Sequence, residues 1–307
     1  MKTKSILSLL VMLLALGITT ISCKKDKTSD PENPENPENP TQTEITGFIN
    51  GVFSVKNDRK VCFSKGNLQY QASTNTWRFA ENQYDFIGED NINAASDYEG
   101  WVDLFCWGTS GYNHGAVCYQ PWSTTIGDEN YYAYGDVDKD LSDDSGKADW
   151  GYNPIINGGN TENQWRTLKQ YEWGYLLNDR STESGIRYAK AVVNGINGLI
   201  VVPDNWSDSI YSLNQPNCEE GNYIDNIIDS TEWATKLEVN GAVFLPAAGL
   251  RIEDIYSNGD FGNYWSASNS VDTYASTMMF SQSSFKPICS DNRFDGFSVR
   301  LVHTIEE

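Results

Sequence analysis

Residues 84–160 constrain the fold most, because this stretch is crowded with aromatic residues yet has neither a helical nor a strand period. Tyrosine and tryptophan recur there among Gly, Asn and Asp, as in Cys106-Trp107-Gly108 and Ala148-Asp149-Trp150-Gly151-Tyr152-Asn153. A disordered segment would not carry so many large rings. The pattern therefore predicts a long, ordered, loop-rich region with buried aromatic side chains.

Short antiparallel hairpins are predicted on both sides of this region, where turn-forming residues separate two apolar runs. The expected strand pairs are 52–55 with 61–64, 68–71 with 77–79, and 191–193 with 199–202. The third pair brackets residues 194–198, which hold the turn signals Asn194-Gly195 and Asn197-Gly198.

The first of two predicted short helices follows the loop-rich region. Thr167 is expected to cap it, with Gln170 three residues later completing a capping box. Its buried stripe is predicted to consist of Trp173, Leu176 and Leu177.

The second helix is predicted to start after Ser230 and to carry Trp233 and Leu237 inward. It should end at Asn240-Gly241, because glycine is the common residue just past a helix C-terminus. The apolar run 242–245 then predicts a strand.

The C-terminal residues combine a regular strand pattern with a variable, polar one. Residues 297–301 alternate three apolar side chains with Ser298 and Arg300, which predicts a strand with one buried face. Before it, residues 269–295 are crowded with Ser, Asn, Asp, Thr and Tyr around a few apolar positions. This segment indicates a fixed scaffold that displays changeable side chains; a polar loop on a sheet edge is the alternative.

The N-terminus has the pattern of an exported protein. Lys2 and Lys4 precede the apolar run 6–16, which is too short to span a bilayer, so residues 1–22 are predicted to be a secretory signal peptide. Cys23, directly after a small residue, resembles the lipidated cysteine of a bacterial lipobox. Residues 23–44 then form the predicted tether, because prolines at every third position favour extended chain.

The net charge narrows the choice of partners. The chain of 307 residues carries 42 Asp and Glu against 22 Lys and Arg, and removing residues 1–22 with Lys2 and Lys4 takes the formal charge from −20 to −22. Nucleic acid is not an expected partner, because a polyanion requires a concentrated basic patch. The expected attachment to the membrane is through the N-terminal lipid.

The cysteines predict neither a disulfide framework nor a metal site. Five remain after Cys23, and this odd count leaves at least one thiol without an intramolecular partner. They are Cys62, Cys106, Cys118, Cys218 and Cys289. No CxxC or Cys/His cluster occurs, so we expect no metal, and Cys106 with Cys118 is the only pair worth testing.

Several segments of the body together resemble one protein family. They are 63–70 (FSKGNLQY), 148–153 (ADWGYN), 165–168 (WRTL), Glu172-Trp173, 199–206, 241–249 (GAVFLPAAG), Tyr264-Trp265-Ser266 and 296–302 (GFSVRLV). This set resembles the major paralogous domain proteins of Gram-negative anaerobes, which are surface lipoproteins. The resemblance implies an α+β, C-type-lectin-like or formylglycine-generating-enzyme-like fold over residues 45–307, with short antiparallel strands, two short helices and long ordered loops. It also implies an N-terminal hairpin extension, a ligand-display segment at 264–302, and a place at the outer membrane, outward-facing.

Some relatives are target proteins of diversity-generating retroelements, in which ligand-facing positions are rewritten. The resemblance implies that eleven residues face a ligand, either an extracellular protein or a glycan: Asn269, Asp272, Tyr274, Ser276, Ser281, Ser283, Phe285, Asp291, Asn292, Phe294 and Asp295. Rings and small polar groups are also the mixture that antibody loops use. Met278, Met279 and residues 286–289 depart from the usual pattern of the family.

Other function classes remain alternatives. An enzyme is not expected, because the oxidase cousin needs a reactive cysteine pair and neither His114 nor His303 lies in a motif. Calcium-dependent sugar binding is a second reading, since Asp136, Asp138 and Asp140 have EF-hand spacing and residues 215–217 (QPN) resemble a lectin tripeptide. However, Leu141 and Lys147 replace the turn glycine and the bidentate glutamate of an EF-hand. A structural surface-coat role is the third.

Overall fold

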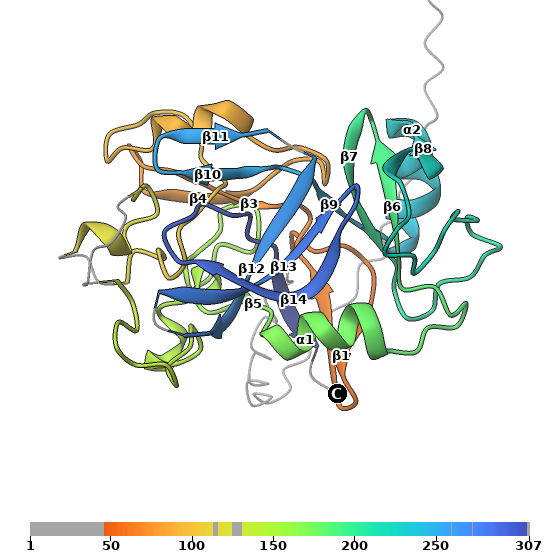
Figure 1. The fold of residues 1–307 in the computed structure, drawn as a ribbon, viewed down its shortest axis with the longest axis horizontal. Coiled ribbons are helices and arrows are strands. Elements are labelled where there is room, and N and C mark those ends of the chain that lie inside the picture. The colour runs from red at the N-terminus through yellow and green to blue at the C-terminus, as the bar shows by residue number, and fades with distance from the viewer. Residues whose placement is uncertain (1–45, 113–115, 125–130, 259, 272, 306–307) are drawn as a thin grey trace, which may run out of the picture. The chain divides into compact units, whose positions relative to one another are not determined.

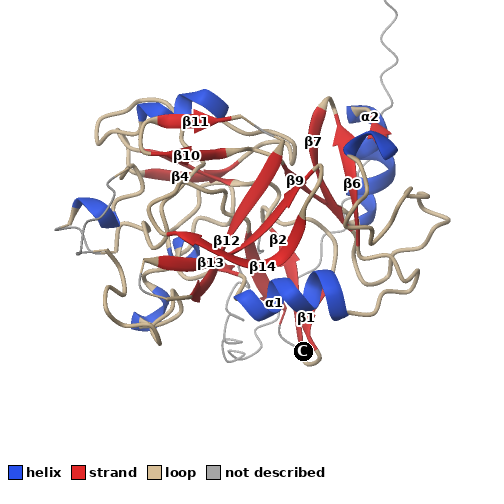
Figure 2. Ribbon diagram, in the orientation of Figure 1, coloured by secondary structure: helices blue, strands red, loops and turns tan. Residues whose placement is uncertain are grey.

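Turn-forming residues interrupt the apolar runs at short intervals, and short antiparallel strands in small sheets result (Figures 1 and 2). The computed structural model describes residues 46–112, 116–124, 131–258, 260–271 and 273–305. Over these residues the chain is an α+β protein with few helices, as predicted. The predictions for residues 1–44, including lipidation of Cys23, lie outside the described residues.

The two ends of the described chain meet in one four-stranded sheet, ordered β1-β2-β15-β5. Its strands are β1 (Phe53–Lys56), β2 (Arg59–Phe63), β15 (Leu301–Ile305) and β5 (Arg166–Thr167). The β1–β2 hairpin is where the sequence predicts it, and β15 pairs antiparallel with β2 from Val302 opposite Phe63. Long-range pairing of this sort ties the first and last segments into one body.

A second four-stranded sheet has the order β8-β6-β7-β9. It consists of β8 (Ile227–Ile228), β6 (Tyr188–Val193), β7 (Ile196–Val201) and β9 (Val243–Pro246). The predicted hairpin is confirmed, with its turn limited to Asn194 and Gly195, whose φ angles are 50° and 81°. Positive φ at both central residues suits a two-residue hairpin, because that turn matches the twist of the strands.

The third sheet holds most of the predicted display segment. Strands β12 (Phe261–Asn269), β13 (Tyr274–Ser281) and β14 (Phe285–Asn292) form an antiparallel meander, and α1 packs beside it (Figure 1). The alternative of a polar loop on a sheet edge is therefore wrong for residues 274–281 and 285–292. Smaller pairs complete the strands: β3 (Leu68–Gln71) with β4 (Thr76–Phe79), and β10 (Leu250–Ile252) with β11 (Ile255–Ser257).

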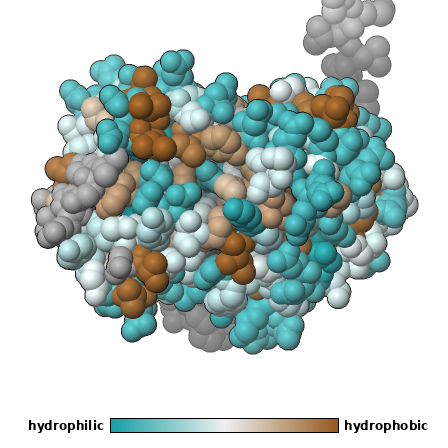
Figure 3. All heavy atoms as spheres, in the orientation of Figure 1, coloured by the Kyte–Doolittle hydropathy of each residue, from teal (hydrophilic) through white to brown (hydrophobic). Residues whose placement is uncertain are grey.

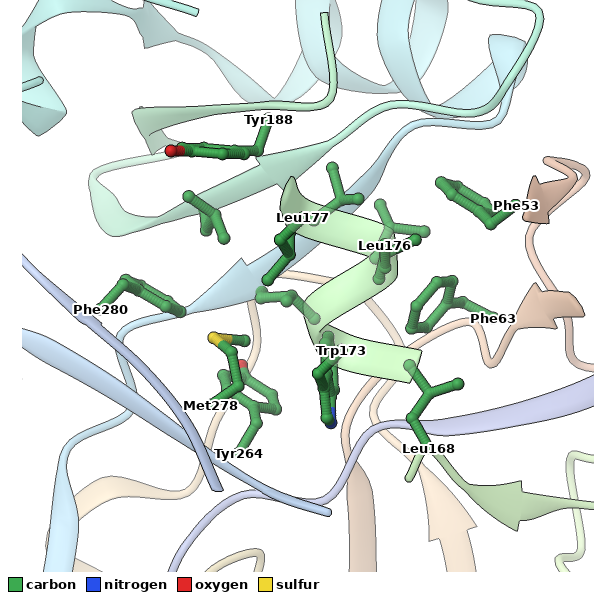
Figure 4. Packing of buried hydrophobic residues seen from close by; sticks show 14 of the residues in the cluster. Phe53, Phe63, Leu168, Trp173, Leu176, Leu177, Tyr188, Tyr264, Met278 and Phe280 are labelled. Carbon is green, nitrogen blue, oxygen red and sulfur yellow. The ribbon is translucent and has the colours of Figure 1, made fainter. Parts of the chain in front are cut away.

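Helix α1 (Gln170–Gly174) continues as a π-type turn through Tyr175–Asp179, and the main core gathers around it (Figure 4). Trp173, Leu176 and Leu177 are fully buried, as predicted. The predicted cap is wrong. Thr167 belongs to β5, where Asp149 accepts hydrogen bonds from its amide and hydroxyl, and the helix begins after Lys169.

Helix α2 (Ser230–Glu232) continues through Trp233–Leu237 and Glu238–Asn240. Asp229 caps it by accepting the Glu232 amide at 2.8 Å, so the helix starts one residue earlier than predicted. Gly241, with φ of 86°, ends it as predicted. Among the described residues, no helix has both the length and the apolar character needed to cross a bilayer.

The loop-rich region is ordered by buried rings, as predicted, and also by buried polar side chains. Over the residues described there, its helical structure consists of 3-10 turns at Gly88–Asn93, Val117–Tyr119, Asp144–Gly146 and Trp150–Tyr152. Trp107 and Trp150, the latter at the start of the last turn, are fully buried. Asn91 accepts the amides of Asp103 and Leu104 through one carbonyl oxygen, so a side chain replaces a strand partner here.

The prediction of a C-terminal strand with one buried face is wrong. Regular pairing begins only at Leu301, and Ser298 and Arg300 are each 1% exposed. The guanidinium of Arg300 is stabilised in this buried position by hydrogen bonds that it donates to the Gln83 side chain at 2.7 Å and to the Phe244 carbonyl. The side chain of Arg300 can therefore be buried because its hydrogen-bond partners come from distant parts of the sequence.

Candidate ligand-binding site

Four of the predicted ligand-facing residues meet at one end of the β12–β14 sheet. Asn269 ends β12, Tyr274 begins β13, and Asp291 and Asn292 end β14. Tyr274 pairs with Asn292 across the strands, and the neighbouring pair brings Asp291 and Asn269 alongside Ala275. We call these four residues the sheet-end cluster; Tyr274 is 41% exposed and the other three are partly exposed.

Arg293 holds the sheet-end cluster in place from beneath. Its guanidinium donates to the backbone carbonyls of Tyr132 at 2.8 Å and Tyr274 at 3.2 Å, and to the Asn269 side chain. It also lies 4.5 Å from the ring centroid of Trp107. A buried cation fixed by so many contacts positions the residues around it. Sequence reasoning missed Arg293, because one arginine in a polar segment reads as an exposed side chain.

The loop-rich region contacts the sheet-end cluster directly. The Asn269 amide donates to the carbonyls of Asp136 at 2.8 Å and Lys139 at 3.1 Å. Since its carbonyl oxygen also accepts from Arg293, Asn269 joins the loop, the strand end and the buried cation. Its role is to connect these parts, and the exposed ring of Tyr274 is the freest contact surface of the cluster.

The carboxyl group of Asp295 gives this end of the sheet a charge that changes near pH 6. Burial, followed by the nearby Asp291 carboxylate, raises the pKa of Asp295 to about 6. A hydrogen bond from Asn292 and the charge of Arg251 oppose this rise. The site is consequently more negative at pH 7 than at pH 5.

Two other predicted residues lie at the opposite end of the sheet. Ser281 ends β13 and Ser283 lies in the turn that leads to β14. At about 3.3 Å per residue, the eight residues of β13 separate this turn from Tyr274 by about 23 Å. The predicted set is therefore split, and one small ligand cannot contact both ends.

Four predicted residues are buried, so the expectation that they lie at an exposed face is wrong. They are Ser276 (1% exposed), Phe285 (6%), Phe294 (8%) and Asp295 (8%). Phe285 stacks on Tyr188 with ring centroids 4.2 Å apart, and Phe294 packs edge-on against Tyr131 at 5.3 Å. Both rings are buried because they pack against aromatic residues of other segments of the chain. Asp272 lies outside the described residues.

The candidate calcium ligands serve local structure. Over the described ranges, no group of three or more His, Cys, Asp or Glu side chains gathers as a metal site. Asp140 binds the Lys169 ammonium at 3.0 Å, and the hydroxyl of Ser142 donates to the same carboxylate. Asn217, of the lectin-like tripeptide, accepts the Arg187 amide at 2.8 Å.

The residues weighed for catalysis or disulfides have structural surroundings as well. A ring nitrogen of His303 lies 2.8 Å from the Gln164 carbonyl, whereas His114 lies outside the described residues. Cys62, Cys106, Cys218 and Cys289 are free thiols, so Cys106 forms no disulfide with Cys118. Burial raises the pKa of Cys106, and its thiol donates to the Phe294 carbonyl at 2.9 Å.

Comparison of the chain with protein-family models, curated proteins and solved structures gives no significant match.

Proposed function

We propose that this chain is a surface lipoprotein whose body binds an extracellular protein or glycan through the sheet-end cluster. The observation that carries the proposal is the meeting of Asn269, Tyr274, Asp291 and Asn292 at one strand end. The exposed Tyr274 ring offers rigid contact area, and the Asn292 amide and the Asp291 carboxylate offer adaptable hydrogen bonds, while Asn269 connects these residues to the loop. Arg293 fixes the backbone beneath them, so a ligand does not have to order the site.

The proposal includes the C-type-lectin-like fold and the attachment. The α+β arrangement of short strands, short helices and long ordered loops agrees with what the family resemblance requires. Lipidation of Cys23 and a tether over 23–44 rest on the sequence pattern. Together they would hold the body at the outer membrane, facing outward and clear of the surface.

The face drawn in Figure 3 favours ligand capture over a structural coat. On the face drawn in Figure 3, apolar residues lie in small separate groups among polar ones. A coat component that assembles through apolar contact would present a large continuous patch. The acidic surface keeps the body soluble and disfavours polyanions.

The experiment is an array of host glycans and extracellular proteins probed with the full chain in mild detergent. Tyr274→Ala combined with Asn292→Ala is expected to weaken binding of the captured ligand by about tenfold or more, since both are central contacts. Ser283→Ala, about 23 Å away at the other end of β13, is the matched control and should leave binding unchanged. Equal effects of the two variants would remove the sheet-end cluster as the binding site.

The resemblance extends this proposal to the targets of diversity-generating retroelements. Adenine-directed variation would then concentrate in the codons of the exposed Tyr274 and the partly exposed Asp291 and Asn292, and spare the buried Ala275 and Phe280. Deep sequencing of this gene from one bacterial population tests it. Variation spread evenly over exposed and buried codons would reject the extension.

A further inference from the structure

Two hollows meet at Tyr112 on the surface of the loop-rich region, next to the sheet-end cluster. One, of about 410 Å³, is lined by Tyr112 with Tyr119, Tyr132, Lys139 and Asp144. The other, of about 300 Å³, is lined by Tyr112 with Lys147, Tyr152, Asn153 and Glu162. Tyr112 lines both hollows, and we call the two together the tyrosine groove. Each volume falls in the range of small-molecule sites.

Two rings of the tyrosine groove, Tyr119 and Tyr132, are held in place before any ligand binds. The Tyr132 hydroxyl donates to the Asp140 carbonyl at 2.9 Å, and its ring packs against Trp107 with centroids 5.9 Å apart. Tyr119 meets Tyr132 edge-on at 6.4 Å. Tyr112 is 37% exposed, so one free ring stands beside a fixed pair. Such rings offer flat apolar platforms with polar tips.

The charged groups of the tyrosine groove balance each other. The Lys139 ammonium lies 2.6 Å from the Asp144 carboxylate and 5.0 Å from the Tyr132 ring centroid, and both side chains of the ion pair are about one-third exposed (31% and 32%). Lys147 and Glu162 add one exposed charge of each sign. Two cations and two anions give a charged ligand no net attraction, yet they offer donors and acceptors to hydroxyl groups.

We propose that the tyrosine groove binds an uncharged oligosaccharide. A sugar ring has a C–H face that packs on an aromatic ring and a rim of hydroxyls that need hydrogen-bond partners. The lining supplies both, whereas an apolar ligand would cover these charged groups and offer them no hydrogen-bond partner in place of water. The inference rests on the proposed recognition function for the premise that the body meets extracellular ligands, but it uses different residues from the sheet-end cluster.

The test is isothermal titration of the full chain in mild detergent with neutral oligosaccharides of glucose, mannose, galactose and N-acetylglucosamine. We expect one series to bind, and Tyr112→Ala to weaken that binding by about tenfold or more. Tyr112→Phe keeps the ring and should stay within about threefold of the wild type. Tyr171→Ala, also an exposed tyrosine (47%) but on α1 and outside the groove, should bind as the wild type does.

Three results overturn the inference: none of the neutral series binds a chain with native near-UV circular dichroism, only charged saccharides bind, or Tyr112→Ala binds as the wild type does. The double variant at Tyr274 and Asn292 separates this proposal from the previous one. If it abolishes saccharide binding while Tyr112→Ala does not, the sheet-end cluster holds the saccharide and the groove proposal falls. If Tyr112→Ala alone abolishes saccharide binding, the groove stands and the saccharide is not held by the sheet-end cluster.

Discussion

The sheet β8-β6-β7-β9 and the loop-rich region provide hydrogen-bond partners for their buried backbone groups in different ways. In the sheet, backbone groups pair in ladders, six residue pairs between β6 and β7 alone, and apolar side chains fill the space beneath. In the loop-rich region, side chains such as Asn91 and Asp149 bind the backbone instead. Every buried N–H and C=O needs a partner, and a few polar side chains supply them where no ladder exists.

The difference teaches where each region is vulnerable. Ladders and apolar contacts spread stability over many residues, whereas the loop-rich region concentrates it in a few buried polar groups. The candidate sites depend on the second region, since Arg293 and Asn269 join it to the sheet-end cluster. Four changes test this comparison, from the largest expected effect to the smallest.

The largest effect is expected in the apolar core. Trp173 is fully buried between Phe63, with ring centroids 6.2 Å apart, and Tyr264, at 6.4 Å. Trp173→Ala should lower the free energy of unfolding by about 4 kcal/mol, because it leaves a large cavity. Urea titration measures it, with Tyr171→Ala as the exposed control on the same helix. A loss below about 1 kcal/mol would mean that this core is not packed as described.

Arg293→Met should lower the free energy of unfolding by about 3 kcal/mol. The change removes the hydrogen-bond donor to the backbone carbonyls of Tyr132 and Tyr274 and leaves these carbonyls buried. Arg78→Met is the matched control, since its guanidinium is partly exposed over the Trp101 ring at 3.7 Å. We expect that control to cost less than about 1 kcal/mol in the same titration. Similar losses for the two variants would contradict the special role of a buried cation in this region.

The pH dependence of stability should reveal Asp103. Burial raises the pKa of this carboxyl to about 6, against hydrogen bonds from Asn91 and the Ile87 amide that lower it. A folded pKa above the unfolded one stabilises the protein below about pH 4, and this contribution is lost as pH rises through about 6. The wild type should therefore lose about 3 kcal/mol relative to Asp103→Asn between pH 4 and pH 7.

Urea titrations of both chains at pH 4, 5, 6 and 7 measure this difference. Carboxylates elsewhere titrate equally in the two chains and cancel. A constant difference across this range would mean that Asp103 is not desolvated.

The smallest change compares two turns. Gly195 in the β6–β7 hairpin and Gly135 in the loop-rich region have φ angles of 81° and 71°, and an added Cβ meets nothing within 4 Å at either. Alanine should cost about 1 kcal/mol at each, through backbone strain alone, if both turns are equally fixed. Thermal unfolding of the two variants measures the pair. A loss of stability for Gly195→Ala with none for Gly135→Ala would show that the backbone of the loop-rich region can shift to accommodate alanine.

Local patterns predicted the elements that depend on local chemistry. The turn formers at Asn57-Asp58 and Asn194-Gly195, and the glycine at 241, mark hairpins and a helix end that the structure confirms. The burial of Trp173 and Trp233 was also predicted, from the apolar residues at helical spacing around each of them. These features need only a few neighbouring residues to specify them.

Other features escaped because their partners are distant in sequence. Arg300 is buried by Gln83, which lies 217 residues away, and Thr167 is bound by Asp149 instead of capping a helix. For the same reason, only part of the candidate site was predicted correctly. Its exposed members were recognised by type, but Ser276 and Phe285 are buried by packing that no local period records.

Hydrogen exchange of backbone amides tests most directly whether the loop-rich region is the rigid frame that both proposed sites require. The amide of Phe105 donates to the Phe297 carbonyl at 2.9 Å, and that of Trp107 donates to the Arg293 carbonyl at 2.8 Å. We predict that both exchange within about tenfold of the rates of the β6–β7 ladder, because they open only when the body unfolds. Exchange at the rate of an unfolded chain would contradict the account.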